Sequence, residues 1–387
     1  MGRAVAVAGI IAVILMSVGA VANAGEKPSV SVDWYGYFKL DGSYDQNLSS
    51  HGNFIMWVNP SEDDAQFNMT VKQTRLGLNA TGSGYGNATV KGKLEMDLYG
   101  NGAAENKAAL VIRHAYFSIQ SGNTKLLAGQ SWDLISPLNP STLNYTVLWG
   151  CGNFQYRRPQ VSLHQTFAMG ENTKATLSGG FFRTIGTDLI PLSFSLAGET
   201  SDGSDDGTDA AIPSMQGRLD INYKFSSGAK LRIGGSGLYG QLKAETNLGN
   251  SETYKSWTGC GHLMFSLPSG AGFAGEVYSG SNLAAYLGGI ANGNTVEGVG
   301  ALGAWASAWV KPAPKVKLSS GFGIDQVEED DIGDGARMNN QCFFGNASYS
   351  IVPGASVGFE VSQWQTEYKN VDTYSSLRAQ TSFVLKF

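Results

Sequence analysis

The amino-acid sequence predicts an all-β fold, a transmembrane antiparallel β-barrel of about sixteen strands. Three observations predict it: apolar and polar residues alternate in many segments, only 15% of the residues are charged, and the one long apolar run stands at the N-terminus. Soluble chains usually contain about a quarter of charged residues. After residue 24 no apolar stretch is long enough for a membrane-spanning helix. A membrane protein with this sequence would therefore cross the bilayer with strands.

The N-terminus has the features of a secretion signal. Arg3 precedes an apolar run from Ala4 to Ala20, and Ala22-Asn23-Ala24 offers small residues at a cleavage site. This pattern predicts a signal peptide over residues 1–24, which is removed from the mature protein. The site is not followed by a cysteine, which argues against a lipoprotein. We expect residues 25–387 to form a single barrel domain.

Five segments show the two-residue period of a strand most clearly, whereas a helix would repeat near 3.6 residues. They cover residues 30–40, 88–98, 215–225, 316–325 and 378–387. In the second segment Ala, Val, Gly, Leu and Met alternate with Thr, Lys, Glu and Asp. One face of each strand is then apolar and the other polar, as a strand between lipid and water requires.

The connections between the strands alternate in length. Short turns rich in Gly, Pro, Asn and Ser occupy residues 81–87, 121–124, 226–228, 268–272, 311–314 and 353–354. Longer segments lie near residues 45–66, 132–155, 184–213, 241–254, 281–298 and 326–337. In outer-membrane barrels the short turns are periplasmic and the long loops extracellular. The even strand count places both termini on the short-turn rim. Because sixteen strands leave an aqueous channel, transport is the leading predicted function.

The last strand ends on an aromatic residue. Its apolar face carries Ala379, Thr381, Phe383, Leu385 and Phe387, and its polar face carries Arg378, Gln380, Ser382 and Lys386. The terminal phenylalanine resembles the sorting signal of bacterial outer-membrane barrels. We therefore expect it to be recognised by the barrel-assembly machinery, and we expect the strand to close the sheet.

Several short motifs in the first half of the chain resemble the DcaP-like porins, a family of trimeric Gram-negative outer-membrane porins. They lie at Gly36–Asp45, Thr74–Leu78, Arg113–Tyr116, Leu127–Trp132 and Tyr156–Gln160. The second half of the chain is similar only in pattern, and the periplasmic helical extension of some members is absent. The resemblance implies a homotrimer in the outer membrane, in contact with its lipid and lipopolysaccharide. It also implies a water-filled diffusion channel for small hydrophilic solutes.

The resemblance also implies a constriction. In porins the third extracellular loop folds into the lumen opposite a ladder of basic residues, and by strand count this loop is Ser131–Tyr156. The residues expected at the constriction are Lys39, Arg75, Arg113, Gln130, Asp133, Arg157 and Arg158; Arg113 and a further candidate, Arg183, are less securely aligned. Gln130 stands where general porins place an arginine, and Arg157 is out of phase with its strand.

The predicted consequence is a mild preference for small anions such as carboxylates, because rings of Arg and Lys select anions. Asp133 is the only acidic residue between Ser131 and Arg158, so we expect little to oppose the field of Arg75 and Arg158. The alternative is that these arginines rigidify the barrel wall by pairing with lumen acids such as Asp41 or Glu95.

The acidic residues concentrate in two long loops. One holds Asp188, Glu199, Asp202, Asp205, Asp206 and Asp209, and the other holds Glu328, Glu329, Asp330, Asp331 and Asp334. They either solvate the surface or bind divalent cations that bridge to lipopolysaccharide phosphates. No cofactor or dedicated metal site is predicted. The three cysteines, Cys151, Cys260 and Cys342, lack metal-ligand spacing, and their disulfide state stays open.

Two other functions compete with transport. A surface receptor or adhesin would use the acidic loops to bind a partner on an inert barrel. An outer-membrane hydrolase would need a Ser–His pair, but His164 and His262 read as lumen-facing strand residues and the sequence lacks a GxSxG motif. We therefore predict that the protein is not an enzyme. Nucleic-acid binding is not expected, since basic residues do not cluster with interleaved aromatics.

Overall fold

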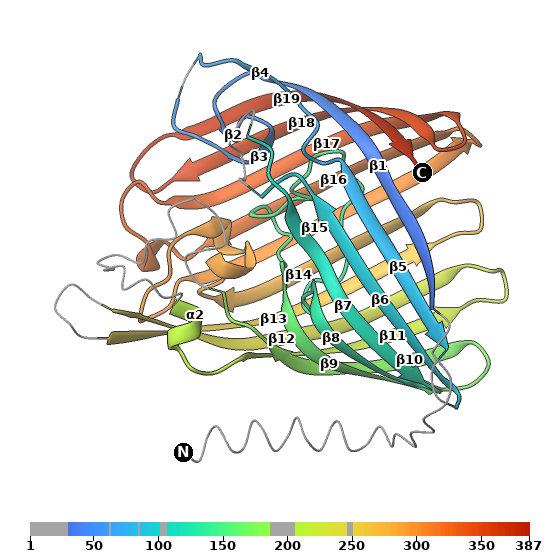
Figure 1. Ribbon diagram of the computed structural model, residues 1–387. Coiled ribbons are helices and arrows are strands. Elements are labelled where there is room, and N and C mark those ends of the chain that lie inside the picture. Colours follow the sequence, from blue (N-terminus) through green and yellow to red (C-terminus); the bar gives the residue numbers. More distant parts are fainter. Residues whose placement is uncertain (1–29, 62, 84–85, 101–106, 186–205, 246–250) are drawn as a thin grey trace.

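A computed structural model describes residues 30–61, 63–83, 86–100, 107–185, 206–245 and 251–387. These residues form one closed antiparallel β-barrel (Figure 1), as the alternation predicted. The predicted signal peptide lies outside the described residues. Within them, no helix has both the length and the apolar character that crossing a bilayer requires.

The barrel wall has sixteen strand positions, since β4 and β5 share one position beside β1 in a sheet of 17 strands. The first half contains β1 (Val30–Asp45), β4 (Gln66–Thr70), β5 (Arg75–Ser83), β6 (Ala88–Asp97), β7 (Val111–Ser121), β8 (Thr124–Trp132), β9 (Arg157–Ala168) and β10 (Thr173–Phe182). The second half contains β11 (Ser214–Lys224), β12 (Lys230–Glu245), β13 (Ser251–Ser266), β14 (Gly272–Ser281), β15 (Gly300–Ala313), β16 (Val316–Val327), β17 (Arg337–Val352), β18 (Ala355–Tyr368) and β19 (Thr373–Lys386).

The first and last strands close the ring. β1 pairs with β19 from Tyr37 to Asp45, and beyond this ladder Gly36 and Phe387 exchange two backbone hydrogen bonds of 3.1 and 3.2 Å. Val30 and Lys386 lie on the same rim as the short turns, on the right in Figure 1. The sequence predictions of a closing last strand and of termini on the short-turn rim are confirmed.

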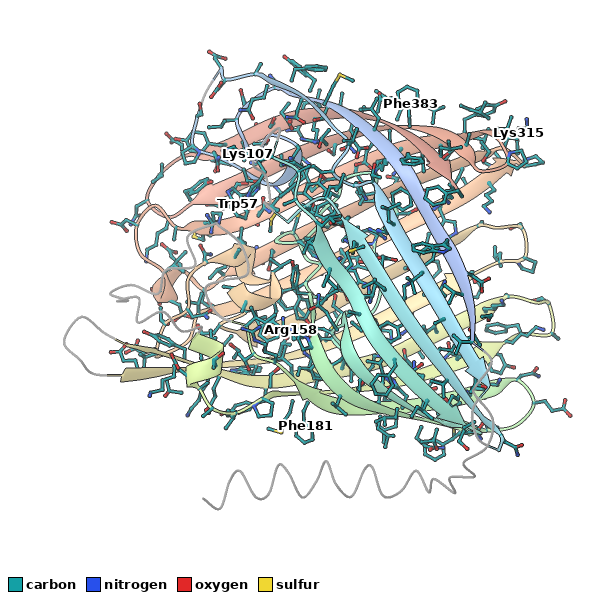
Figure 2. All side chains as sticks on the ribbon, viewed as in Figure 1. Trp57, Lys107, Arg158, Phe181, Lys315 and Phe383 are labelled. Atoms are coloured by element: carbon teal, nitrogen blue, oxygen red, sulfur yellow. The ribbon has the colours of Figure 1, made fainter. Side chains whose placement is uncertain are left out.

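Side chains alternate between an apolar outer face and a polar inner face. In β1 the odd positions such as Lys39 and Asp41 are buried inside, and the even positions such as Trp34 and Phe38 are exposed outside. Phe181 and Phe383 project outward from different parts of the wall (Figure 2). A two-residue period is sufficient to produce this division, because successive side chains of a strand point to opposite faces.

Two connections differ from the predictions. The expected long segment at 241–254 is mostly strand, because β12 and β13 stay paired as far as Glu245 and Ser251. A long connection that was not predicted, residues 98–110, joins β6 to β7. Alternating hydrophobicity weakens where strands rise above the apolar band of a barrel, so sequence pattern places these strand ends poorly.

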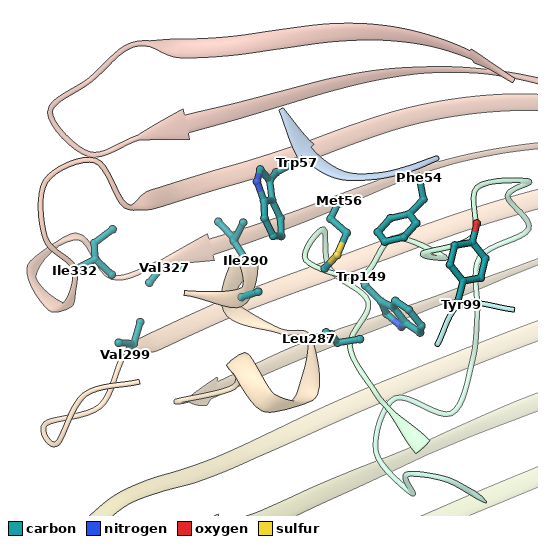
Figure 3. Close-up of a cluster of buried hydrophobic side chains, with 11 residues drawn as sticks. Phe54, Met56, Trp57, Tyr99, Trp149, Leu287, Ile290, Val299, Val327 and Ile332 are labelled. Atoms are coloured by element: carbon teal, nitrogen blue, oxygen red, sulfur yellow. The ribbon is translucent and has the colours of Figure 1, made fainter. Parts of the chain in front are cut away.

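Three connections fold into the barrel at its long-loop end. We call them loop 1 (residues 46–65, with β2 Ser49–His51 and β3 Phe54–Val58), loop 3 (residues 133–156) and loop 6 (residues 282–299, with short 3-10 turns η2 Ala284–Tyr286 and η3 Gly289–Ala291). Phe54 and Trp57 of loop 1, Trp149 of loop 3 and Ile290 of loop 6 share one buried hydrophobic cluster (Figure 3). The two remaining elements, α2 (Asp206–Asp209) and η4 (Glu329–Asp331), lie in other long loops.

Candidate functional site

Loop 3 folds into the lumen, and β11 holds its beginning. The backbone N–H of Leu134 donates to Oε1 of Gln216 at 2.7 Å, and the Gln216 amide donates to Oδ1 of Asp133 at 2.7 Å. Across the root of the loop, the N–H of Tyr156 donates to Oδ2 of Asp133 at 2.9 Å. These bonds turn the chain inward at the point where β8 ends.

Two wall glutamates hold the middle of loop 3. Glu276 on β14 accepts from the hydroxyl of Ser136 and from the backbone N–H of Leu138, at 2.5 and 2.9 Å. Glu360 on β18 accepts from the hydroxyl of Thr142 and the N–H of Leu143, both at 2.7 Å. Burying a carboxylate is costly unless donors satisfy its oxygens, so these contacts fix the loop along the wall.

The far part of loop 3 reaches β19 and β1. The carbonyl of Leu143 accepts from Nζ of Lys39 at 3.3 Å and from Nε2 of Gln380 at 3.2 Å. Loop 3 therefore follows the inner wall from β11 round to β1. The wall from β5 to β10 is the part that this loop leaves facing the lumen.

Loop 1 packs on the other side of loop 3. The carbonyl of Ile55 accepts from Asn144 and Thr146 at 2.9 and 3.0 Å. Asn340 on β17 then joins the two loops, because its amide donates to Met56 O and Gly150 O at 2.7 and 2.6 Å. Loops 1 and 3 therefore pack together inside the barrel, and Asn340 joins both to the wall.

Arg158 does not line the lumen as the selectivity hypothesis required. Its side chain points inward, as its strand phase predicted, but it is 0% exposed. Its Nε lies 2.8 Å from Oδ1 of Asp133, and its guanidinium stacks 4.2 Å from the ring centre of Tyr286. The expectation that little opposes its field was wrong, because the single acid of loop 3 neutralises it directly.

Three other predicted cations are also paired with acids. Lys39 is buried with Nζ 3.2 Å from Asp41, and Arg113 is buried between Glu95 and Asp97 at 2.9 and 2.6 Å. Arg75 pairs with Glu95 at 3.4 Å but stays 20% exposed. The alternative named from the sequence, that these cations rigidify the wall, therefore describes Lys39, Arg113 and Arg158, whereas Arg75 still faces the lumen.

Gln130 and Arg157 take positions that differ from the prediction. The neighbours of Gln130 pair with Gln160 and Arg158, which face inward, so Gln130 points outward and its amide donates to Ile112 O at 2.6 Å. The prediction that Gln130 lies at the constriction was therefore wrong. Arg157 is buried between the rings of Trp132 and Tyr156, at 4.6 and 5.0 Å from their centres. Arg183 is exposed beyond the end of β10.

Besides Arg75, five basic residues that were not among the predicted site residues face the lumen. We call them the basic strip: Lys91 and Lys93 on β6, Lys125 on β8, Arg218 on β11 and Arg232 on β12. The side chains of Lys93 and Arg232 are 27% and 22% exposed. The alternation of β6 and β11 placed some of these residues on the polar face, but only the packing of the loops distinguishes an open inner position from a covered one.

The acids beside the basic strip are less exposed than the cations. Asp220 accepts from Arg218 and Arg232 at 2.8 and 2.7 Å and also contacts Nε2 of His262 at 2.9 Å. Glu95 likewise lies within 4.0 Å of Arg75, Lys93 and Arg113, and it is only 6% exposed. Asp220 and Glu95 each serve several cations and are more covered than Lys93 and Arg232.

In the described part of the chain, neither His164 nor His262 contacts both a serine hydroxyl and a carboxylate. His164 Nε2 lies 3.2 Å from Ser162 Oγ, and its Nδ1 lies 2.8 Å from Ser178 Oγ. Both ring nitrogens thus contact hydroxyls, whereas a serine hydrolase needs a carboxylate or amide behind the base. His262 contacts Asp220 instead of a hydroxyl.

The surroundings of the three cysteines and of the acidic loops bear on the question of metal binding. Cys151, Cys260 and Cys342 are free and buried, and burial raises the pKa of the Cys151 thiol well above its usual value. The described residues contain no group of three or more His, Cys, Asp or Glu side chains that could hold a metal ion. Asp188, Glu199, Asp202 and Asp205 of the first acidic loop lie outside the described residues.

The structure is similar to solved structures of a channel and a porin. The outer membrane channel DcaP of Acinetobacter baumannii shares 18% identity over 95% of this chain and 100% of its own, with a TM-score of 0.70. An anion-selective porin from Comamonas acidovorans shares 12% identity over 93% of this chain and 100% of its own, with a TM-score of 0.56.

A third similar structure is the outer membrane protein OmpT of Vibrio cholerae in a trimer form. It shares 12% identity over 93% of this chain and 100% of its own, with a TM-score of 0.56. Neither the protein-family models nor the curated proteins that were searched match the sequence. At these identities the likeness establishes a shared barrel fold.

Proposed function

We propose that the protein is an outer-membrane porin, a water-filled diffusion channel for small hydrophilic solutes with a mild preference for anions such as carboxylates. The fold supports the channel, because a barrel of this strand number is wide enough to enclose water. The inward folding of loops 1 and 3 supports a restricted passage rather than an open pore. The similar structures are themselves channels and outer-membrane proteins.

The basic strip is the observation that carries the anion preference. Lys91 and Lys125 have no acidic partner within 4.0 Å in the part of the chain that the structure describes, and Lys93, Arg75 and Arg232 remain partly exposed beside theirs. Rings of Lys and Arg select anions in channels. Because Asp220 and Glu95 are largely covered, a passing solute meets ammonium and guanidinium groups before carboxylates.

The selectivity is tested by replacing two exposed cations whose acids keep other partners. In the double variant Arg75→Gln with Arg232→Gln, Glu95 retains Arg113 and Lys93, and Asp220 retains Arg218. We expect the reversal potential in a salt gradient to move toward cations, most clearly at low salt, because screening acts over about 8 Å at physiological ionic strength.

Lys315→Gln is the matched control, since Lys315 is exposed on the turn between β15 and β16 at the short-turn rim (Figure 2). This variant is expected to keep the wild-type reversal potential. Purified protein that forms no channel in a planar bilayer would refute the porin function. A channel with unchanged selectivity in the double variant would refute the role of Arg75 and Arg232 in the anion preference.

The remaining parts of the proposal concern assembly. We propose that the chain forms a homotrimer in the Gram-negative outer membrane, that the barrel-assembly machinery recognises Phe387, and that the acidic loops bind divalent cations beside lipopolysaccharide. The trimer form of a similar barrel supports the first of these. Chemical cross-linking in whole cells would show whether the protein is trimeric there.

A further inference from the structure

The inner wall contains a cavity of about 380 Å³ near the short-turn rim, between β5, β6, β7 and β8. Its lining includes Lys91, Lys93 and Lys125 together with the hydroxyl groups of Thr81, Thr89 and Ser118. Thr89 and Lys125 stand close to the turns that join β5 to β6 and β7 to β8. The cavity therefore lies on the short-turn side of the passage.

The three lysines of this cavity are poorly neutralised. Lys93 lies 3.5 Å from Glu95, but Lys91 and Lys125 lack an acidic partner in the described part of the chain. Lys91 and Lys125 line the same cavity, so like charges gather on one surface there. The lining of the cavity contains no carboxylate. A bound anion would offset these like charges, and the lining offers ammonium, hydroxyl and amide groups as donors.

The donors indicate the shape of the anion. Lysine acts as a point charge on a flexible stem, whereas arginine offers a planar fork that matches a carboxylate. Three ammonium groups and several hydroxyls can surround a compact tetrahedral oxyanion from different sides. An extended dicarboxylate would engage the lysines with its two ends and leave the hydroxyl donors unused.

We propose that Lys91, Lys93 and Lys125 form a binding subsite for a tetrahedral oxyanion such as inorganic phosphate. The inference rests on the proposed channel function, and the subsite holds the anion at the periplasmic side of the constriction. It raises the local concentration of phosphate in the vestibule and slows its departure. Chloride and phosphate therefore compete for the same part of the passage.

The channel test measures chloride current through the full-length purified protein in a planar bilayer, with phosphate, sulfate or succinate added to one side. Phosphate and sulfate are expected to reduce the current saturably and more strongly from the short-turn side. Succinate, a dicarboxylate, is expected to act more weakly. Equal inhibition by succinate would overturn the preference for a tetrahedral anion.

The triple variant Lys91→Gln, Lys93→Gln, Lys125→Gln is expected to raise the half-inhibiting phosphate concentration by about tenfold or more, on the usual relation between binding free energy and affinity. Lys315→Gln, with its exposed lysine on the same rim, is expected to leave it unchanged. The single variants are measured beside the triple variant, and retained resistance to heat in detergent shows that each barrel is folded. Unchanged inhibition in a folded triple variant would overturn the subsite.

A calorimetric titration of the detergent-solubilised protein with inorganic phosphate separates this subsite from the channel function. Saturable binding by a protein that conducts no ions would refute the porin and leave the subsite standing. Conduction without lysine-dependent binding would refute the subsite alone.

Discussion

Arg158 on β9 and Asp133 at the start of loop 3 form an ion pair of 2.8 Å in which both side chains are 0% exposed. The pair joins β9, the strand that follows loop 3, to the first residue of that loop. Arg158 also donates to the carbonyl of Ala285 in loop 6 at 3.2 Å. One guanidinium therefore fastens two inward loops to the wall, and this explains why a basic residue at the constriction carries no exposed charge.

Arg158→Met is expected to destabilise the barrel, because it leaves the carboxylate of Asp133 buried without its cation. Breaking a buried pair typically costs about 3–5 kcal/mol. The measurements are the temperature at which the protein unfolds in detergent and the noise of the single-channel current. Adding Asp133→Asn should recover part of the loss, since the amide can keep the hydrogen bond from the N–H of Tyr156. A stable Arg158→Met channel whose reversal potential moves toward cations would instead restore Arg158 as a selectivity residue.

Gly152→Ala is expected to displace the tip of loop 3. The residue has a φ of +90°, and a Cβ atom here would lie 2.0 Å from the carbonyl oxygen of Ala304. Gly170 in the turn after β9 has a φ of +107° with open space around it, so Gly170→Ala carries the backbone strain without the clash. That strain is of order 1–3 kcal/mol. We expect larger and noisier single-channel currents for Gly152→Ala but not for Gly170→Ala. Equal currents for the two variants would show that loop 3 accommodates the added Cβ atom.

Replacing Phe387 by Lys is expected to lower the amount of barrel recovered in the outer membrane far more than replacing Lys386 by Gln. The Phe387 ring lies on the outer face, 5.3 Å from the ring of Phe38, whereas the register of Lys386 opposite Tyr37 turns it inward. The last strand closes the sheet, so an apolar outer residue at its end stabilises the seam in lipid. Assembly is measured as the amount of heat-modifiable protein in outer-membrane fractions. Similar amounts for the two variants would contradict the prediction.

Acid is expected to loosen loop 1 through His51. Burial lowers the pKa of this histidine to about 4, and its ring stacks 4.5 Å from Phe54. Since the folded pKa lies below the ordinary value of 6.5, unfolded chains take up the proton first, and stability falls as the pH drops from 6.5 toward 4. The loss is about 1.4 kcal/mol for each pH unit in that window.

The matching measurement is single-channel current as a function of pH. Wild-type channels should show more frequent fluctuations as the pH falls through this window, and His51→Gln should remove most of that change because glutamine does not titrate. A pH response that persists unchanged in His51→Gln would assign it to other groups.

Much of the barrel follows from local pattern. The alternation in residues 30–40 and 88–98 placed β1 and β6, and the same alternation put Lys39 and Glu95 on the inner face. A single bilayer and a single lumen impose the same two-sided requirement on every strand. For that reason the strand number and the closing contact at Phe387 could be predicted from the sequence. The ends of β12 and β13 at the long-loop rim could not.

The candidate site depended on contacts that local pattern does not contain. The phase of β9 correctly turned Arg158 inward, but its exposure was decided by Asp133 and by loop 6. Resemblance suggested an inward position for Gln130, and the pairing of β8 with β9 turned it outward. The open cations at Lys91 and Lys93 were visible as polar residues on a predicted strand, but nothing local marked them as uncovered.

The sequence by itself determined that sixteen strands form a ring with an apolar outside and a polar inside, because side-chain direction in a strand depends only on position along it. The tertiary structure decided which inner charges meet water. Glu276 holds Leu138 across 138 residues, and Glu360 holds Leu143 across 217. These distant contacts lay loop 3 along one part of the wall, whereas Lys91, Lys93 and Lys125 of the basic strip lie on another part. Burial and pairing depend on such contacts between remote segments, so the charge that a solute meets is a property of the folded chain.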